Sequence, residues 1–168
     1  MVKHIPGHGR ARADSHLELP VVEASRADLE RDFLPFRALA DAPAAMTAHV
    51  VYAAIDPTAP CTTSAKMISQ IVRGEIGFDG LLFSDDLSMK ALGGAFDARA
   101  RAAFAAGVDI VLHCNGDLNE ARSVAEASPP LEGRALARAE AMMTCVANTD
   151  DFDVAAARAQ LATLFPAA

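Results

Sequence analysis

The first residues of the chain hold an unusual density of side chains that can do acid/base chemistry. They are one lysine, three histidines and an aspartate: Lys3, His4, His8, His16 and Asp14. Asp14 and His16 are two residues apart, so both side chains project to the same side of an extended segment. A carboxylate beside an imidazole orients the ring and stabilises its protonated form, which suits a general acid/base. The alternative is a surface turn with solvated polar residues.

A second candidate for chemistry is the sequence Ser84-Asp85-Asp86, which follows an apolar run. Adjacent carboxylates on an extended backbone point in different directions, so only one of them can face a site at the end of a strand. We expect Asp86 to cap a helix that begins near Leu87, which leaves Asp85 free to act as a nucleophile.

Further candidates are His49, in Thr47-Ala48-His49, and His113, in Leu112-His113-Cys114-Asn115, because each is a single histidine in an apolar run. A single histidine in such a run is more often a hydrogen-bonded core residue than a catalytic one. We therefore expect both to line a site or to belong to the core rather than to react.

Apolar segments with the length of buried strands position these residues. The predicted strands cover residues 44–51, 80–84 and 109–114, and Val2 is what remains of an apolar strand before a predicted loop over residues 3–20. Continuous apolar runs indicate a parallel sheet covered on both faces. Ligands bind at the carboxyl ends of strands in α/β folds, so the loop and the strand ends should meet at one site.

Apolar residues at helical spacing predict the elements between and after these strands. The predicted helices start at residue 25 with a kink or division at Pro35, and then cover 64–74, 97–106, 118–127, 131–146 and 154–164. Ser25 with Asp28 resembles a capping arrangement, and Gly107 is expected to end the third helix. Four residues should share one face of the first helix: Leu29, Phe33, Phe36 and Leu39.

The composition is that of one globular domain with a sizeable core, because 52% of the 168 residues are hydrophobic and 22% are charged. A net charge of −7 gives no basic surface for nucleic acid or an anionic membrane.

No run approaches the roughly 18 apolar residues of a membrane span, and the start has no apolar signal segment. Cys61, Cys114 and Cys145 have no metal-like spacing and are expected to be reduced thiols. We therefore expect a cytoplasmic location.

Several motifs occur together in a recognisable order. The start of the chain resembles the KHFPGHG…DSH…LP signature of family 3 β-N-acetylglucosaminidases of bacterial cell-wall recycling. The matching residues are Lys3-His4-Ile5-Pro6-Gly7-His8-Gly9, Asp14-Ser15-His16 and Leu19-Pro20. Ile5 stands where the signature commonly has phenylalanine. Further similar segments are Met46-Thr47-Ala48-His49-Val50, Gly77-Phe78-Asp79-Gly80, Ser84-Asp85-Asp86-Leu87-Ser88-Met89 and Ala106-Gly107-Val108-Asp109. The resemblance covers roughly residues 3–143.

The resemblance implies a (β/α)₈ barrel glycosidase with a retaining mechanism. Asp85 corresponds to the nucleophile of the family, and His16 to its acid/base residue on a mobile loop, with Asp14 as partner. Lys3 and His4 correspond to residues that bind the hydroxyls of the N-acetylglucosamine ring, and we count His49 among the substrate-binding residues. Most retaining glycosidases use two carboxyl groups about 5 Å apart, and here His16 would replace the second one.

The implied substrates are N-acetylglucosaminyl-anhydro-muropeptides, from which N-acetylglucosamine is released, and aryl glycosides that mimic them. No metal or organic cofactor is expected. The resemblance leaves two alternatives open. The chain is an inactive remnant of such an enzyme, or it belongs to a member of the family in which phosphate replaces water as the acceptor of the glycosyl group. A metal-dependent hydrolase that uses His4, His8, Asp14 and His16 is a third alternative, although Pro6-Gly7 breaks any helix that would align the first two.

The length departs from that of the family, because a (β/α)₈ barrel has typically about 250 residues and at least about 200. We therefore expect residues 1–168 to be a partial catalytic domain truncated at its N-terminus. Its predicted α/β fold is the C-terminal half of a TIM barrel, with about three to four parallel strands and covering helices. Half a barrel has two open sheet edges, so self-association through these edges is expected.

Overall fold

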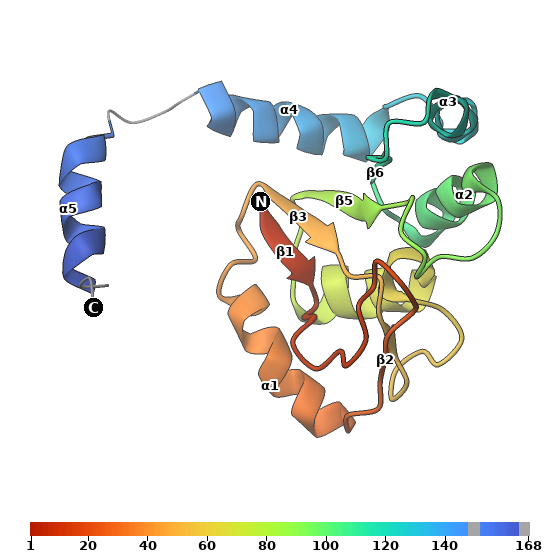
Figure 1. Ribbon diagram of the computed structural model, residues 1–168, viewed down its shortest axis with the longest axis horizontal. Coiled ribbons are helices and arrows are strands. Elements are labelled where there is room, and N and C mark those ends of the chain that lie inside the picture. The colour runs from red at the N-terminus through yellow and green to blue at the C-terminus, as the bar shows by residue number, and fades with distance from the viewer. Residues whose placement is uncertain (148–151, 165–168) are drawn as a thin grey trace.

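The computed structural model describes residues 1–147 and 152–164 (Figure 1). Four parallel strands form one sheet in the order β1-β3-β5-β6. Their bounds are Val2–Ile5 for β1, Ala44–Thr47 for β3, Leu81–Asp86 for β5 and Ile110–Leu112 for β6. Within the described residues the sheet is open and does not close into a barrel. The expected α/β fold with three to four parallel strands is confirmed, while the predicted domain also includes residues 148–151 and 165–168, which lie outside the described ones.

The first strand corrects the predicted loop over residues 3–20. β1 runs through Lys3 and His4 to Ile5, and it pairs with β3 at Val2↔Ala45 and Lys3↔Met46. Polar side chains at the end of a short strand hide the apolar signal on which strand prediction depends. The loop therefore begins after Ile5.

The predicted strand over residues 44–51 is also wrong in its extent. β3 ends at Thr47, and the chain then turns into a separate strand, β4 (Val51–Tyr52). β4 pairs in parallel with β2 (Val21–Val22) in a second, two-stranded sheet. One apolar run thus contributes to two different sheets. Its composition gives no sign of the turn that separates the two strands.

Helices separate the strands and continue after the last one (Figure 1). They are α1 (Arg26–Arg37), the short 3₁₀ helix η1 (Cys61–Thr63), the π-helix η2 (Met67–Glu75), α2 (Phe96–Ala106), α3 (Leu118–Ala127), α4 (Gly133–Ala147) and α5 (Val154–Leu164). Residues of α1, η2 and α2 share one core with β1, β3 and β5. This arrangement is that of successive strand–helix–strand units in a parallel sheet. None of the residues of α5 is buried, and Figure 1 shows this helix apart from the sheet.

Helix α1 forms largely as its sequence predicts. The hydroxyl of Ser25 accepts a hydrogen bond from the backbone N–H of Asp28, so the cap is confirmed. Leu29 and Phe33 are fully buried, whereas Leu39 is half exposed because it lies beyond the end of the helix. Pro35 does not divide the helix, since it lies in the last turn.

The sequence predicts the positions of helices η2 and α2 but not the kind of helix that η2 forms. The second predicted helix is a π-helix, in which, for example, the N–H of Ile76 bonds the carbonyl of Ile71. Its buried residues are Met67, Ile68, Ile71 and Val72, a spacing that fits an α-helix equally well. Helix α2 ends as predicted at Gly107, whose φ of 104° is the left-handed conformation favoured by glycine.

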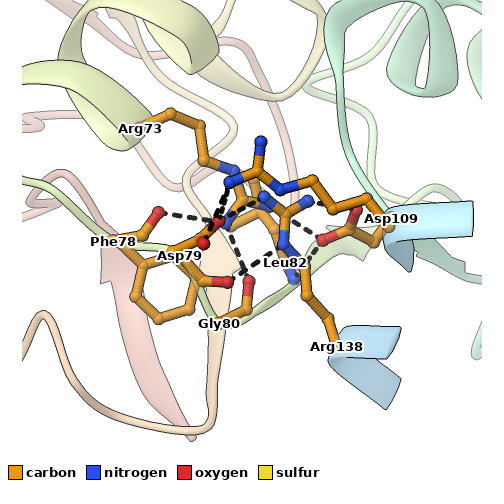
Figure 2. A network of polar contacts seen from close by, with 8 residues as sticks. Arg73, Phe78, Asp79, Gly80, Leu82, Asp109 and Arg138 are labelled. Carbon is orange, nitrogen blue, oxygen red and sulfur yellow. Dashed lines mark hydrogen bonds and ion pairs between the residues drawn. The ribbon is translucent and has the colours of Figure 1, made fainter. Parts of the chain in front are cut away.

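Ion pairs connect helix α4 to the residues that precede β5 and β6 (Figure 2). This end of the sheet is opposite the polar strand ends. Arg73 of η2 donates to Asp109 at 2.8 Å and to the carbonyl oxygens of Phe78 and Gly80. Arg138 of α4 donates to the other carboxylate oxygen of Asp109 at 2.9 Å and also bonds Asp79. The side chain of Asp109 is only 6% exposed, so its two oxygens join η2, β6 and α4 in a desolvated place.

Replacing Asp109 with alanine should lower the free energy of unfolding by about 3–5 kcal/mol, because it leaves two largely buried guanidinium groups without this partner. Urea unfolding followed by circular dichroism measures the loss. The matched control is Arg134→Ala, whose side chain is 74% exposed in its pair with Asp79 and should cost less than about 1 kcal/mol. Equal unfolding midpoints for the two variants would show that the network does not stabilise the fold.

Candidate active site

Polar side chains gather at the carboxyl end of the parallel sheet. His4 lies in β1, His49 follows β3, Asp85 ends β5 together with Asp86, and His113 follows β6. Two distances join these strand ends: Nε2 of His4 lies 3.4 Å from Oδ2 of Asp85, and Nε2 of His49 lies 3.0 Å from the carbonyl oxygen of Asp86. The strand ends therefore meet as the sequence predicts.

The Asp85 carboxylate is held at a fixed place and still reaches solvent. Its Oδ1 accepts the backbone N–H of Asp86 at 2.9 Å, and its Oδ2 faces the His4 ring. The side chain is 16% exposed. One carboxylate oxygen is thus oriented by the backbone, and the other faces His4.

His4 provides a neutral hydrogen-bonding group beside this carboxylate. Burial lowers the pKa of His4 below its ordinary value, and the nearby Asp85 opposes this shift only in part, while Lys3 adds to it. The ring is therefore mostly uncharged near neutral pH and does not neutralise Asp85. Such a ring can share a hydrogen bond with a hydroxyl of a bound ligand.

Asp86 does not cap a helix, which corrects the expectation for this residue. The residues after β5 form turns, and the next helix begins only at Phe96. Asp86 Oδ1 accepts the N–H groups of Ser88 at 2.9 Å and Cys114 at 3.0 Å. Burial alone would raise the pKa of Asp86, but its hydrogen bonds with Ser88 and Cys114 outweigh burial and lower it. Asp86 thus fastens the turn that follows the candidate nucleophile to β6.

Asp14 and His16 form a hydrogen-bonded pair on the loop after β1. Nδ1 of His16 lies 2.8 Å from Oδ1 of Asp14, and the same oxygen accepts the His16 backbone N–H at 2.9 Å. The segment is a turn closed by the N–H of Leu17 on the Asp14 carbonyl, so the expected extended conformation is wrong although the side chains do meet. The hydrogen bonds from His16 lower the pKa of Asp14, which stays ionised.

Backbone hydrogen bonds hold this loop beside the segment that follows β5. The N–H of Lys90 bonds the His16 carbonyl at 3.3 Å, and the N–H of Ala91 bonds the Ser15 carbonyl at 3.2 Å. The side chain of His16 remains 74% exposed. The loop therefore places an exposed Asp–His pair beside the segment that follows β5.

Lys3 and His4 border an open groove between β1, the loop and α1. The groove has a volume of about 590 Å³, and its lining also includes His8, Arg10 and Phe36. Lys3 is exposed, while Arg10 is paired with Asp32 of α1. The ammonium group of Lys3 is thus available to a ligand beside His4.

His49 is fully buried, and both of its ring nitrogens have protein partners. Nδ1 lies 2.7 Å from the hydroxyl of Thr62, and Nε2 lies 3.0 Å from the Asp86 carbonyl oxygen. Direct contact with a sugar would require one of these bonds to break. The sequence does not reveal Thr62, because a threonine in a helix as short as η1 carries no pattern that distinguishes it.

His113 follows β6 and contacts residues of α2 and α3. Its side chain is 5% exposed, packs edge-on against Phe96 and has its Nε2 3.3 Å from a carboxylate oxygen of Glu120. The position fits the expected role in the core or the site wall, but within the described residues neither buried ring nitrogen makes a hydrogen bond, so the hydrogen-bonded core histidine typical of such runs is not found here.

Residues 1–147 and 152–164 contain no group of three or more His, Cys, Asp or Glu side chains placed to hold a metal ion. No helix within these residues has the length and apolar character needed to cross a membrane. Cys61, Cys114 and Cys145 are all free, as predicted. Burial raises the pKa of the Cys61 thiol to about 12, so it is not a nucleophile at neutral pH.

The folded chain should lose stability as the pH falls from about 7 to 5. Burial lowers the pKa of His4 and of His49 below the ordinary value of 6.5. The unfolded chain then binds protons that the folded chain does not, so this stability is complete above pH 6.5 and is lost as the pH falls below it. Carboxylates titrate mainly below about pH 4.5 and contribute little here.

Urea unfolding at both pH values measures this difference, which should be smaller in a His49→Gln variant. A free energy of unfolding that does not change over this range would contradict the prediction.

Comparison with known proteins gives a consistent result. Residues 1–144 match the family model described as the glycosyl hydrolase family 3 N terminal domain. A beta-hexosaminidase of Alkalilimnicola ehrlichii is 52% identical over 118 residues, which is 67% of this chain and 34% of that protein. A beta-hexosaminidase of Chromobacterium violaceum is 43% identical over 145 residues, 83% of this chain and 40% of that protein.

Solved structures agree with these relatives. A family 3 β-N-acetylglucosaminidase from Paenibacillus sp. superposes with a TM-score of 0.77 at 32% identity, over 91% of this chain and 32% of that one. NagZ from Neisseria gonorrhoeae, solved in complex with N-trifluoroacetyl-D-glucosamine, gives a TM-score of 0.71 at 41% identity, over 83% of this chain and 41% of that one. The chain spans about a third to two fifths of the length of these proteins.

A parallel sheet with helices between its strands and polar side chains at its carboxyl end belongs to the class of TIM-barrel-like α/β proteins. Within this class, the chain belongs to glycosyl hydrolase family 3 and matches the N-terminal domain of that family.

Proposed function

We propose that this chain is part of the catalytic domain of a retaining β-N-acetylhexosaminidase that removes terminal β-linked N-acetylglucosamine. The observation that carries the proposal is the Asp85 carboxylate at the end of β5, beside His4, with the Asp14–His16 pair held next to the following segment. The names of the relatives, beta-hexosaminidase and β-N-acetylglucosaminidase, support the same activity.

The residue types allow both steps of a retaining mechanism. In the first step, a carboxylate oxygen of Asp85 bonds the anomeric carbon, the glycosidic C–O bond breaks, and protonated His16 gives its proton to the leaving oxygen. In the second step, neutral His16 takes a proton from water, the water oxygen bonds the anomeric carbon, and the glycosyl–Asp85 bond breaks. Asp14 keeps the His16 ring oriented and stabilises its cation.

The remaining polar residues would bind and orient the sugar. Lys3 and His4 border the open groove and can donate hydrogen bonds to ring hydroxyls. His49 lies behind the site, so its proposed part in substrate binding is indirect. We propose N-acetylglucosaminyl-anhydro-muropeptides of peptidoglycan recycling as substrates and the cytoplasm as the location. The mechanism uses side chains of the protein alone, without a cofactor.

The activity of the chain by itself depends on how its open sheet is completed. β1 and β6 are the edges of the four-stranded sheet, and exposed parallel edges favour pairing with another chain. We therefore expect self-association in solution. An assay of the purified chain on an aryl β-N-acetylglucosaminide, with light scattering to give its mass, tests both points.

Measurable turnover in that assay would support the proposed activity. A folded, associated chain without turnover would favour the inactive remnant.

Phosphate is a second candidate acceptor in place of water. The Asp–His pair adds less negative charge to the site than a second carboxylic acid would, which favours the approach of an anion. Initial rates in phosphate and in a non-phosphate buffer of equal ionic strength distinguish the two. A glycosyl phosphate product would identify phosphate as the acceptor.

A further inference from the structure

Three buried side chains form a line of hydrogen bonds behind Asp85. The hydroxyls of Thr47 and Thr62 lie 2.8 Å apart, the Thr62 hydroxyl lies 2.7 Å from Nδ1 of His49, and Nε2 of His49 lies 3.0 Å from the Asp86 carbonyl oxygen. All three side chains are fully buried. No solvent competes for these bonds, so each donor must face an acceptor within the line.

Only one arrangement of protons satisfies this line. A carbonyl oxygen can only accept, so Nε2 of His49 must carry a proton. Burial lowers the pKa of His49 and keeps the ring neutral, so Nδ1 carries no proton and accepts from the Thr62 hydroxyl. The Thr62 oxygen then accepts from Thr47. The single Thr62 proton has three acceptors within reach, and Nδ1 at 2.7 Å is nearer than the Thr47 hydroxyl at 2.8 Å and the Ala48 carbonyl at 3.2 Å.

The bond from His49 replaces a backbone link that the sheet lacks at this place. The pairing of β3 with β5 ends at Met46↔Phe83, and the pairing of β5 with β6 is irregular between Phe83 and Asp86. On its other side, the peptide group between Asp86 and Leu87 donates to the Leu112 carbonyl at 2.8 Å. This peptide group is therefore fixed from β6 by a backbone bond and from β3 by the His49 side chain.

The fixed peptide lies one residue after the candidate nucleophile. The backbone N–H of Asp86 donates to Oδ1 of Asp85, so a shift of the Asp86 backbone would move the carboxylate as well. An error of about 1 Å in the position of a reacting group can cost about 100-fold in rate.

We propose that His49 is a positioning residue whose Nε2–H form, required by the Asp86 carbonyl and completed by the Thr62 hydroxyl at Nδ1, holds the end of β5 and thereby sets the place of the Asp85 carboxylate. This inference rests on the proposed role of Asp85 as nucleophile. It assigns His49 to the orientation of the protein rather than to contact with the sugar.

Two amide variants separate this role from simple filling of the core. His49→Gln can place an N–H where Nε2 lies, whereas His49→Asn reaches only the position of Nδ1. We expect kcat on an aryl β-N-acetylglucosaminide to fall about 10–100-fold in His49→Asn, with KM little changed, and to be largely retained in His49→Gln. Thr62→Val removes the donor to Nδ1 and should loosen the ring, which then keeps only its bond to the Asp86 carbonyl, so we expect a smaller fall in kcat than in His49→Asn.

Nuclear magnetic resonance tests the proposal without any need for turnover. Long-range ¹H–¹⁵N correlations of the unmutated chain should show His49 as the Nε2–H tautomer, and the Asp85 carboxyl ¹³C shift should change in His49→Asn more than in His49→Gln. A His49 ring protonated at Nδ1 in the unmutated chain, or equal ¹³C shifts in the two variants, would overturn the proposal. The unmutated chain still decides the tautomer if a variant fails to fold.

Failure of this inference differs from failure of the proposed function. Turnover that survives Asp85→Ala would reject the nucleophile, whatever the His49 tautomer. Loss of turnover in Asp85→Ala together with unchanged kcat in His49→Asn would reject the positioning role alone.

Discussion

Asp85→Ala should lower kcat on an aryl β-N-acetylglucosaminide by at least about 10,000-fold, as expected when a covalent nucleophile is lost. Without the carboxylate, the anomeric carbon has no partner for the first displacement. Substrate binding should change much less, because Lys3 and His4 remain in place. Steady-state kinetics of the active, assembled protein measures both quantities.

Two comparisons make this test specific. Asp97→Asn changes an exposed carboxylate in the first turn of α2 and should leave kcat unaltered. Azide can enter the space left in Asp85→Ala, attack the anomeric carbon and partly restore release of the aryl group. Ordinary turnover by Asp85→Ala would contradict the assignment of the nucleophile.

His16→Ala should slow substrates with poor leaving groups by about 100–10,000-fold, the usual contribution of general acid/base catalysis. An alkoxide needs a proton to leave, whereas an activated phenolate does not. The loss in the first step should therefore be small for a dinitrophenyl glycoside and large for a disaccharide. Rates on the two substrates under single-turnover conditions measure this contrast.

The neighbouring residues provide the controls for His16. Asp14→Asn removes the charge that stabilises the His16 cation but leaves the ring, so its loss should be smaller and follow the same order of substrates. His8→Ala changes another loop histidine, whose Nε2 lies 3.3 Å from the Ser15 hydroxyl, and should not discriminate between leaving groups. Equal losses on both substrates in His16→Ala would indicate a role in binding or loop structure instead.

The sequence predicts the elements whose signals are local. The Ser25 cap, the left-handed Gly107 and the bounds of α3 and α5 follow from residue types within one or two turns. The open parallel sheet follows from apolar runs that do not alternate. These features depend on neighbours in the chain and need no knowledge of distant contacts.

Features that depend on distant partners could not be predicted in this way. β1 is a strand because β3 pairs with it, although Lys3 and His4 are polar. The run over residues 44–51 is divided because β2 pairs with its second part. The partners of His49 lie 13 and 37 residues away along the chain, so its tautomer is set by tertiary structure alone.

The candidate site could be predicted only in part from the sequence. The Asp14–His16 contact was expected from the two-residue spacing, but a turn produces it rather than an extended strand. Asp85 was expected to be free because Asp86 would cap a helix, whereas Asp86 in fact holds a turn and the backbone of Cys114. The residue types thus predict which side chains lie together in the site. The backbone conformation that brings them together could not be predicted from these types.

Trapping the covalent intermediate tests the central claim most directly. A fluorinated N-acetylglucosaminyl fluoride forms a glycosyl–enzyme that is hydrolysed slowly, and peptide mass spectrometry then locates the sugar. We predict one glycosyl adduct, on the peptide that contains Asp85, and none in Asp85→Ala. An adduct on another residue, or a folded chain that releases fluoride without forming any adduct, would contradict the assignment of Asp85 as the nucleophile of a retaining glycosidase.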